Sequence, residues 1–307
     1  MKRLIAVLLA ALMLLGATGC IRISCTMPVR YSNAEKYTAG DFTYEDTKVT
    51  KVQIEWLAGS VTLKNGKGTL SVTESGADTL KEEDRMHWWI DGTTLKIKYC
   101  KSGSNLSLAD MEKKDLTVEL PAFVDLDLDV ASGKVIAEDM LTLGKFTLDK
   151  ASGNAEIKYL SAKKVNIDTA SGATTLGKVS VSGEFDVDTA SGGLTIDEIA
   201  ADSVSVNSAS GGVRIGTITA DSVRIGTASG GATIGIRKAS TVRVKSTSGG
   251  IRITLLDKEA GAKIKYDAVS GNFNTALSVV NSGDIMTIGQ GLIDMEISLI
   301  SGSVTVD

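Results

Sequence analysis

The feature that most constrains this chain is a short phrase, Ala-Ser-Gly, that recurs through most of its length. From Ser132 to Ser248 the serines of successive copies lie 20, 19, 20, 19, 19 and 19 residues apart. So regular a period is typical of stacked structural repeats, in which each repeat packs on its neighbours. The glycines of the phrase, looser copies included, are Gly133, Gly153, Gly172, Gly192, Gly211, Gly230, Gly249 and Gly271.

Apolar and polar residues alternate on both sides of the Ser-Gly step, as in Phe185-Asp-Val187-Asp before one step and Val213-Arg-Ile215 after the next. A period of two predicts strands with one buried face. Hairpins would satisfy the alternation alone, but the constant phase favours coils stacked on coils, with parallel strands about 4.8 Å apart. The sequence therefore predicts an all-β chain folded as a parallel β-solenoid of either hand. Its coils have about 19–20 residues, with atypical capping coils at both ends.

The eight glycines are predicted to form the structural corners of the coils. A corner calls for a positive φ or for close approach of two backbones, and glycine permits both. The alanine and serine before each glycine are expected at a crowded bend where the hydroxyl bonds local backbone. The composition agrees, since the chain has 32 glycines, 2 prolines and 5% aromatic residues.

The first twenty residues predict a lipoprotein signal peptide over 1–19 and lipidation of Cys20. A basic start, Met1-Lys2-Arg3, precedes an apolar run from Leu4 to Leu15 and then small residues up to the cysteine. The apolar run is too short for a transmembrane helix. Several acyl chains on one cysteine give stable membrane attachment. The alternative is an ordinary cleaved signal with an incidental cysteine. Either way the folded domain is expected outside the cytoplasmic membrane.

The remaining chain divides by regularity. Residues 20–45 are polar without a period and are predicted to be a tether, and residues 46–307 are predicted to be one solenoid domain. Within it we expect atypical coils and a cap over 46–121, regular repeats over 122–275 and a C-terminal cap over 276–307. The aromatic cluster His87-Trp88-Trp89 is interpreted as a plug for the open end of the stack, with sugar stacking as the alternative.

Charge and cysteine content limit the partners. Without residues 1–19 the net charge is 31 − 37 = −6, which disfavours nucleic acid because that needs a concentrated basic face. Cys25 and Cys100 would be free to pair outside the cell, although Cys25 lies in the predicted tether. Two cysteines and one histidine do not predict a metal centre.

Stacking turns equivalent residues into columns, and one column is acidic: Asp129, Asp149, Asp168 and Asp188. Carboxylates this close repel one another unless they are solvated or neutralised. One hypothesis is a cation-binding column, with Ca²⁺ as the ion because it prefers clustered oxygen ligands. The other is a solvated acidic face that keeps the strands soluble.

Later repeats carry basic residues at outward positions, among them Arg214, Arg224, Arg243 and Arg252. A basic surface of this kind would attract anionic wall polymer or phospholipid headgroups. Ordinary variation of a solvated surface is the alternative interpretation.

A resemblance to a known family rests on an ordered set of motifs. These are Val52-Gln-Ile54-Glu, Gly59-Ser60-Val61-Thr-Leu63, Leu95-Lys-Ile97, Leu116-Thr-Val118-Glu-Leu120-Pro121, the serial Ser-Gly repeats, and Ile300-Ser301-Gly302-Ser303-Val304-Thr305. In this order, over about residues 45–307, the chain resembles the bacterial candidate-adhesin domain family of unknown function (DUF4097-like). The resemblance implies a β-solenoid and an envelope location. It also implies that similar domains accompany envelope-stress signalling systems, and it brings no catalytic residues.

We expect no enzyme. The sole histidine would have to serve any Ser-His-Asp triad, no G-x-S-x-G elbow occurs, and the repeats over 125–260 leave no long loops for a catalytic cleft. The leading hypothesis is a lipid-anchored envelope protein presenting its solenoid for adhesion, with cell-wall polymer, glycan or an envelope membrane protein as partner. An accessory protein of an envelope-stress system is the first alternative, and a polysaccharide-active enzyme is the second.

Overall fold

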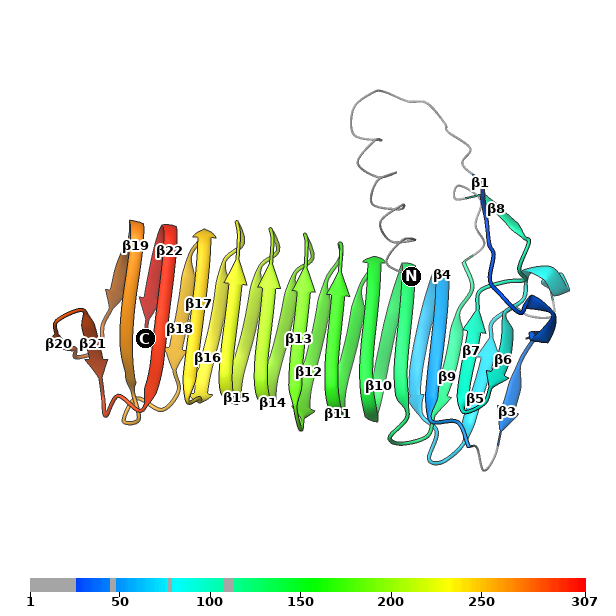
Figure 1. The fold of residues 1–307 in the computed structure, drawn as a ribbon, viewed down its shortest axis with the longest axis horizontal. Coiled ribbons are helices and arrows are strands. Elements are labelled where there is room, and N and C mark those ends of the chain that lie inside the picture. The colour runs from blue at the N-terminus through cyan, green and yellow to red at the C-terminus, as the bar shows by residue number, and fades with distance from the viewer. Residues whose placement is uncertain (1–25, 45–47, 77–78, 108–112) are drawn as a thin grey trace, which may run out of the picture.

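Residues that are equivalent in the sequence repeat lie side by side in the structure. Phe185 pairs with Val204, Val204 with Val223 and Val223 with Val242, each in parallel. The computed structural model describes residues 26–44, 48–76, 79–107 and 113–307, and its strands follow one another along the long axis (Figure 1). The predicted all-β parallel solenoid is confirmed.

The regular stack runs from β10 to β18. In each coil a first strand leads into the Ser-Gly corner, a second strand follows it, and a turn begins the next coil. The elements are β10 (Asp125–Ser152), β11 (Ala155–Thr169), β12 (Thr174–Val181), β13 (Glu184–Thr189), β14 (Leu194–Ser208), β15 (Val213–Thr227), β16 (Ala232–Lys238), β17 (Thr241–Ser248) and β18 (Ile251–Leu255).

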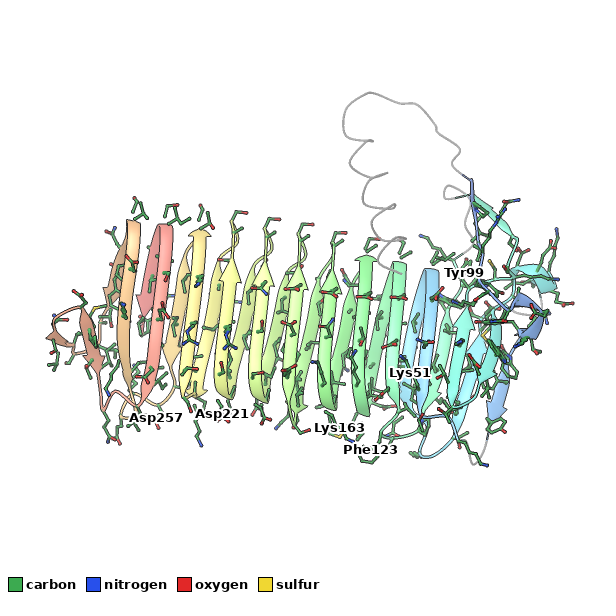
Figure 2. All side chains as sticks on the ribbon, in the orientation of Figure 1. Lys51, Tyr99, Phe123, Lys163, Asp221 and Asp257 are labelled. Atoms are coloured by element: carbon green, nitrogen blue, oxygen red, sulfur yellow. The ribbon has the colours of Figure 1, made fainter. Side chains whose placement is uncertain are left out.

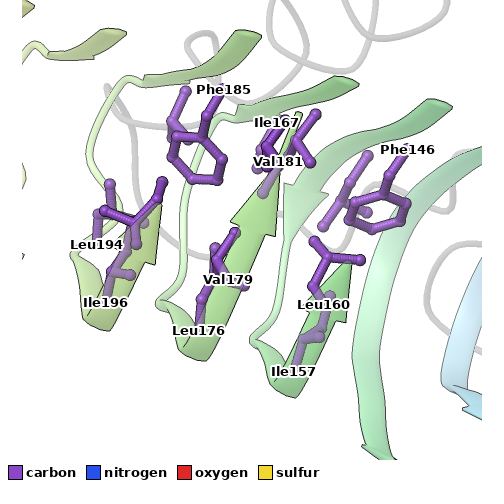
Figure 3. Packing of buried hydrophobic residues seen from close by; sticks show 14 of the residues in the cluster. Phe146, Ile157, Leu160, Ile167, Leu176, Val179, Val181, Phe185, Leu194 and Ile196 are labelled. Carbon is purple, nitrogen blue, oxygen red and sulfur yellow. The ribbon is translucent and has the colours of Figure 1, made fainter. Parts of the chain in front are cut away.

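The alternation predicted from the sequence places one row of apolar side chains per strand inside the stack. Figure 3 shows Phe146 and Phe185 from first strands, with Leu176 and Ile196 from second strands, all almost fully buried. Neighbouring coils supply equivalent residues at each level, so the rows form one continuous core. Burial of these rows is the main driving force for stacking.

The corner glycines form a ladder because the Cα of each one faces the carbonyl oxygen of the glycine one coil earlier. A Cβ built on Gly153, Gly172 or Gly211 would lie 1.9 Å from that oxygen. All eight predicted corner glycines have such a contact with a glycine of the neighbouring coil at 2.6 Å or less, although for Gly271 that neighbour, Gly302, comes later in the chain. Gly153 and Gly172 have left-handed φ values of 90° and 85°, whereas Gly192 and Gly211 do not. Close approach, rather than a positive φ, therefore requires glycine in every coil.

The corner serines tie each coil to the one before it. The Ser210 Oγ donates to the carbonyl of Ala190 at 3.0 Å, and the Ser210 N–H donates to the same oxygen at 2.9 Å. Ser171 does the same with Ala151, at 3.1 Å in both bonds. The prediction of a bond to local backbone is wrong, because the acceptor belongs to the preceding coil.

Buried polar side chains line the inside of the corner. Thr189 Oγ1 donates to the carbonyl of Gly192 at 3.0 Å, and Ser208 donates to that of Gly211 at 2.6 Å. Lys150 occupies the equivalent inner corner position in the coil before that of Thr169, and its Nζ donates to the Gly153 carbonyl at 2.5 Å. The Lys150 side chain is 1% exposed, and burial lowers the pKa of its amine to about 8.

At the N-terminal end the order in space differs from the order in the chain. β4 (Lys51–Asn65) lies between β10 on one side and β7 (Thr94–Lys98) with β9 (Leu116–Leu120) on the other. The remaining elements of the cap are β1 (Thr26–Pro28), η1 (Ala34–Lys36), β2 (Thr38–Ala39), β3 (Phe42–Tyr44), β5 (Leu70–Glu74), η2 (Glu82–Asp84), β6 (His87–Asp91) and β8 (Asn105–Ser107), where η marks a 3₁₀ helix. Among the described residues, no helix has the length and apolar character needed to cross a bilayer.

The predicted tether over 20–45 is wrong for residues 26–44. β1 pairs with β8, β2 with β6 and β3 with β5, all antiparallel, so this segment is folded onto the cap. Trp88 of β6 holds it there, because its ring packs 4.2 Å from that of Phe42 and its Nε1 donates to the Gly40 carbonyl. The signal peptide 1–19 and the lipidation site Cys20 lie outside the described residues.

A buried ion pair closes the core at this end. Lys114 Nζ lies 2.6 Å from Glu74 Oε1, with the two side chains 2% and 0% exposed. Lys114 also donates to the carbonyls of Asp84 and Tyr99, and Glu74 accepts the N–H of Met86. Because both charged groups are fully hydrogen-bonded, their mutual attraction offsets the cost of removing them from water.

The C-terminal end shows a similar exchange of order. β19 (Ala262–Thr275) is the outermost coil, and β22 (Ile293–Val306) lies between it and β17 with β18. β20 (Val280–Ser282) and β21 (Ile285–Ile288) extend β19 outward. The predictions of regular repeats through 275 and of a cap over 276–307 therefore need correction. β22 is an inner coil, because its Gly302 fits the glycine ladder between Gly249 and Gly271.

Gly211→Ala should destabilise the fold by about 3 kcal/mol, because the new methyl group would collide with a backbone oxygen that cannot move alone. The matched control is Gly212→Ala, since a Cβ on Gly212 meets nothing within 4 Å. Urea unfolding of both variants measures the difference. Equal unfolding midpoints for the two variants would show that the ladder does not require glycine.

Lys150→Thr should change how stability depends on pH. Between about pH 8 and 10.5 the folded wild type releases a proton that the unfolded chain still holds, so wild-type stability rises with pH. The variant lacks this rise, which amounts to at most about 3 kcal/mol. Urea unfolding at pH 7, 9 and 11 measures it, with Lys145→Thr, an exposed lysine of the same strand, as control. Parallel profiles for Lys150→Thr and wild type would contradict the expectation.

Candidate functional site

The four aspartates predicted to form a column stand side by side on the outer face of the first strands. Asp149 pairs with Asp168, and Asp168 with Asp188, in successive coils. Asp129 lies one coil earlier, within hydrogen-bond reach of the Asp149 carboxyl. The column continues to Glu55 in one direction and to Asn207, Gly226 and Lys245 in the other.

Raised pKa values relieve the repulsion within this acidic column. Burial raises the pKa of Asp129 to about 7, and the hydrogen bond and negative charge of Asp149 act in the same direction. Burial and the charge of Asp149 also raise the pKa of Asp168. At neutral pH the column therefore carries less negative charge than its carboxyl groups alone would give.

The edges of the acidic column are neutralised by protein groups. Lys98 pairs with Glu55, and Lys51 lies 2.5 Å from Asp127. Burial opposes ionisation of Asp127, but hydrogen bonds from Lys51 and Gln53 hold its pKa below the ordinary value. Within the described ranges, no three His, Cys, Asp or Glu side chains are grouped so as to hold a metal ion. The calcium-binding column stays a prediction, and the raised pKa values of Asp129 and Asp168 are a second way in which the repulsion is reduced.

A cleft of about 370 Å³ lies over the start of the acidic column. Its walls are aromatic, with the Tyr31 and Tyr37 rings 4.7 Å apart and the Tyr37 and Trp89 rings 5.6 Å apart. Its floor is charged and includes Glu55 and Asp129. An aromatic wall facing carboxyl groups can hold an amphipathic or cationic group.

The aromatic wall is partly occupied by the protein's own cations. Lys36 and Lys96 place their ammonium groups 4.9 and 4.8 Å from the Trp89 ring centroid, and Lys98 lies 5.5 Å from that of Tyr31. Burial raises the pKa of Tyr31 to about 12, so its hydroxyl stays protonated and donates to the Cys100 carbonyl. These contacts fasten the N-terminal segment to the solenoid, which is a structural use of the cleft.

Sequence reasoning missed Tyr31 and Tyr37 because they fall in the segment predicted as a tether. The available signal was two aromatic residues within a polar stretch. The predicted aromatic cluster divides in two, since Trp88 packs within the cap while Trp89 faces the cleft. His87 is buried, with its Nδ1 2.9 Å from the Arg85 carbonyl.

The four arginines predicted to form one basic face lie on two faces. Arg224 and Arg243 pair on first strands, whereas Arg214 and Arg252 lie on second strands with Thr233 between them. Arg243 pairs with Glu296 at 3.3 Å and Arg252 with Asp307 at 2.7 Å, so β22 and the C-terminal residue neutralise two of them. The prediction of a single face is wrong, because alternation separates inside from outside but does not say which outer face a residue joins.

Cys100 is a free, buried thiol whose pKa is raised by burial. Its predicted pairing with Cys25 falls on a residue outside the described ranges. The thiol lies inside the cap rather than on an open surface, so nothing in its surroundings marks it as a nucleophile.

Comparison with known proteins gives one family. The family model described as Toastrack DUF4097 matches residues 49–307, in agreement with the resemblance seen in the motifs. No curated protein matches the chain.

Several solved structures are similar to the chain over most of its length. A candidate adhesin from Parabacteroides distasonis is 12% identical, with 91% of this chain and 99% of that chain covered and a TM-score of 0.47. A candidate lipid-binding protein from the same organism is 15% identical, with 88% and 97% covered and a TM-score of 0.46. A candidate adhesin from Parabacteroides merdae is 11% identical, with 91% and 98% covered and a TM-score of 0.45.

Asp129→Asn should stabilise the fold at pH 8 relative to wild type, and this advantage should shrink toward pH 4. Between pH 4 and about 7 the folded protein holds a proton on Asp129 that the unfolded chain releases, so wild-type stability falls as pH rises. The amide side chain of the variant does not titrate, so the variant does not lose stability in this way as the pH rises. Thermal unfolding at pH 4, 6 and 8 should show a gain of a few degrees at pH 8. Asp186→Asn, on the same face, is the control, and an equal gain from it would contradict the raised pKa of Asp129 as the cause.

Proposed function

The chain belongs to the Toastrack DUF4097 family, and we propose that it is a non-enzymatic, lipid-anchored protein of the bacterial cell envelope. In this proposal its β-solenoid is a rigid, elongated surface for adhesion or for contacts with other envelope components. The partners in this proposal are cell-wall polymer or glycan, whereas an envelope membrane protein would be the partner in the accessory alternative.

The observation that carries the proposal is the unbroken stack of coils from β10 to β18. The connections are short, as between β12 and β13, where β12 ends at Val181 and β13 begins at Glu184. Active sites are built preferentially on longer loops held by a rigid scaffold, and this stack offers none over that range. What the stack does offer is a repeated outer surface at fixed spacing, which suits binding rather than chemistry.

The position of the cap supports a membrane-proximal N-terminal end. β1 begins at Thr26, six residues after Cys20. Six residues span at most about 20 Å even when fully extended. A lipid on Cys20 would hold the cap close to the membrane, and the opposite end with β19, β20 and β21 would then point away from the anchor (Figure 1).

In-cell crosslinking tests this proposal. The tagged full chain and a Cys20→Ala variant, which cannot be lipidated, are crosslinked and the captured material is identified. We expect both forms to capture wall polymer or surface glycan and only the wild type to fractionate with membranes.

Two outcomes would contradict the proposal. Capture of a membrane sensor by the anchored form alone would support an accessory role in envelope-stress signalling instead. Absence of any captured envelope component would leave the solenoid as a spacer and remove the adhesion function.

A further inference from the structure

A straight groove of about 480 Å³ follows the edge of the solenoid where each coil turns into the next. Its outer wall repeats one position of five successive coils, which pair in order along the stack: Thr142, Ser161, Ser180, Ala200 and Thr219. Parallel pairing sets these residues about 4.8 Å apart. The groove therefore presents small side chains at a constant step, and four of the five carry a hydroxyl.

Phe123 stands at the head of this groove, where its N–H donates to the Thr142 carbonyl at 2.8 Å. Its side chain is 69% exposed and its φ is 64°. Left-handed backbone is strained for a bulky residue, and exposure of an aromatic ring to water is also unfavourable. Two features that both oppose folding at one residue point to a role in binding. Figure 2 shows Phe123 on the same edge of the solenoid as Lys163 and Asp221.

More exposed apolar surface adjoins the head of the groove. Met140 is 55% exposed and lies two residues before Thr142 in β10, and its partner in the next coil is Tyr159, which is 45% exposed. Phe123 lines the groove, and Met140 and Tyr159 add exposed apolar surface two residues away along the same strands. Such surfaces favour ligands with both apolar and polar faces.

The hydroxyls along the groove are available to a ligand. Within the described residues, those of Thr142, Ser161, Ser180 and Thr219 make no hydrogen bond to protein atoms, whereas the corner hydroxyls of Ser171 and Ser210 donate to the preceding coil. Hydroxyl side chains thus bond to the neighbouring coil at the corner, whereas at the turn they have no partner among the described residues.

The charges at the groove balance. The lining contains Lys163, Lys238, Asp202 and Asp221, two cations and two anions. A polyanion or a polycation would gain little from such a rim, and a purely apolar chain would bury polar groups without partners.

We propose that this groove binds a linear polysaccharide that is uncharged or zwitterionic. One sugar ring stacks on Phe123, and hydroxyls of successive sugars bond to the threonine and serine hydroxyls along the groove. This inference rests on the proposed envelope function and names the ligand class for it.

Calorimetric titration tests the groove, using the full chain with Cys20→Ala. The probes are the hexamer of β-1,4-linked N-acetylglucosamine and the hexamer of β-1,4-linked glucose. We expect at least one hexamer to bind, and Phe123→Gly to weaken that binding about tenfold, because it removes the aromatic surface. Phe123→Trp should retain binding.

The same variant separates binding from folding. Glycine accommodates a φ of 64°, so Phe123→Gly should unfold at the same temperature as wild type or a higher one. Tyr44→Ala, at another exposed aromatic residue outside the groove, should leave binding unchanged. Failure of the wild type to bind either hexamer, or equal binding by Phe123→Gly, would overturn the inference.

Crosslinking distinguishes this failure from failure of the proposed function. If wild type and Phe123→Gly capture the same wall glycan in cells, the envelope function stands and the groove is not its site. If hexamers bind through Phe123 but no envelope glycan is captured in cells, the groove assignment stands and the proposed function is wrong.

Discussion

The structure depends on one close contact, between the Cα of each corner glycine and the carbonyl oxygen of the glycine one coil earlier. A Cβ at 1.9–2.6 Å from that oxygen is sterically impossible, so the contact admits glycine alone. It fixes the relative position of two coils at the corner, and the pairing of the strands beside the corner follows from it, although bulges shift the register farther along β10 and β15. The serine bonds, the rows of the core and the outward columns are all consequences of this single register.

A fixed register brings like residues together, and this limits what the repeat can contain. Valine, isoleucine, alanine, serine and threonine tolerate identical neighbours, and they dominate the array. Charged residues tolerate identical neighbours only where their charge is lowered or neutralised. The pKa of Asp129 is raised by burial and by Asp149, which lowers the charge of the column, and Lys150 is tolerated because backbone carbonyls surround its amine.

The sequence was sufficient for the array and insufficient for its ends. Period and alternation are local signals, and they predict strands, corners and columns directly. The exchange of β4 with β7 and β9, and of β22 with β19, has no local signal, because it depends on which distant strands pair. The folded state of residues 26–44 was missed for a related reason, since Tyr31 and Trp88 hold this segment through contacts far along the chain. Alternation likewise could not assign Arg214 and Arg224 to different faces.

The corner edge of each coil stabilises the fold, whereas the turn edge is the one proposed to bind a ligand. At the corner, the hydroxyl and the backbone N–H of Ser210 both donate to the preceding coil, and the close contact of the glycines excludes any other residue. At the turn, Ser180 belongs to an equally regular column, but its hydroxyl makes no hydrogen bond to the part of the protein that the structure describes. Phe123, with its strained backbone, lies at the head of that column. Regularity alone therefore does not identify a structural residue in a solenoid. The hydrogen-bond partner of its side chain identifies it. A repeated hydroxyl that bonds to the neighbouring coil stabilises the fold, whereas one without a protein partner is free to bind a repeating ligand.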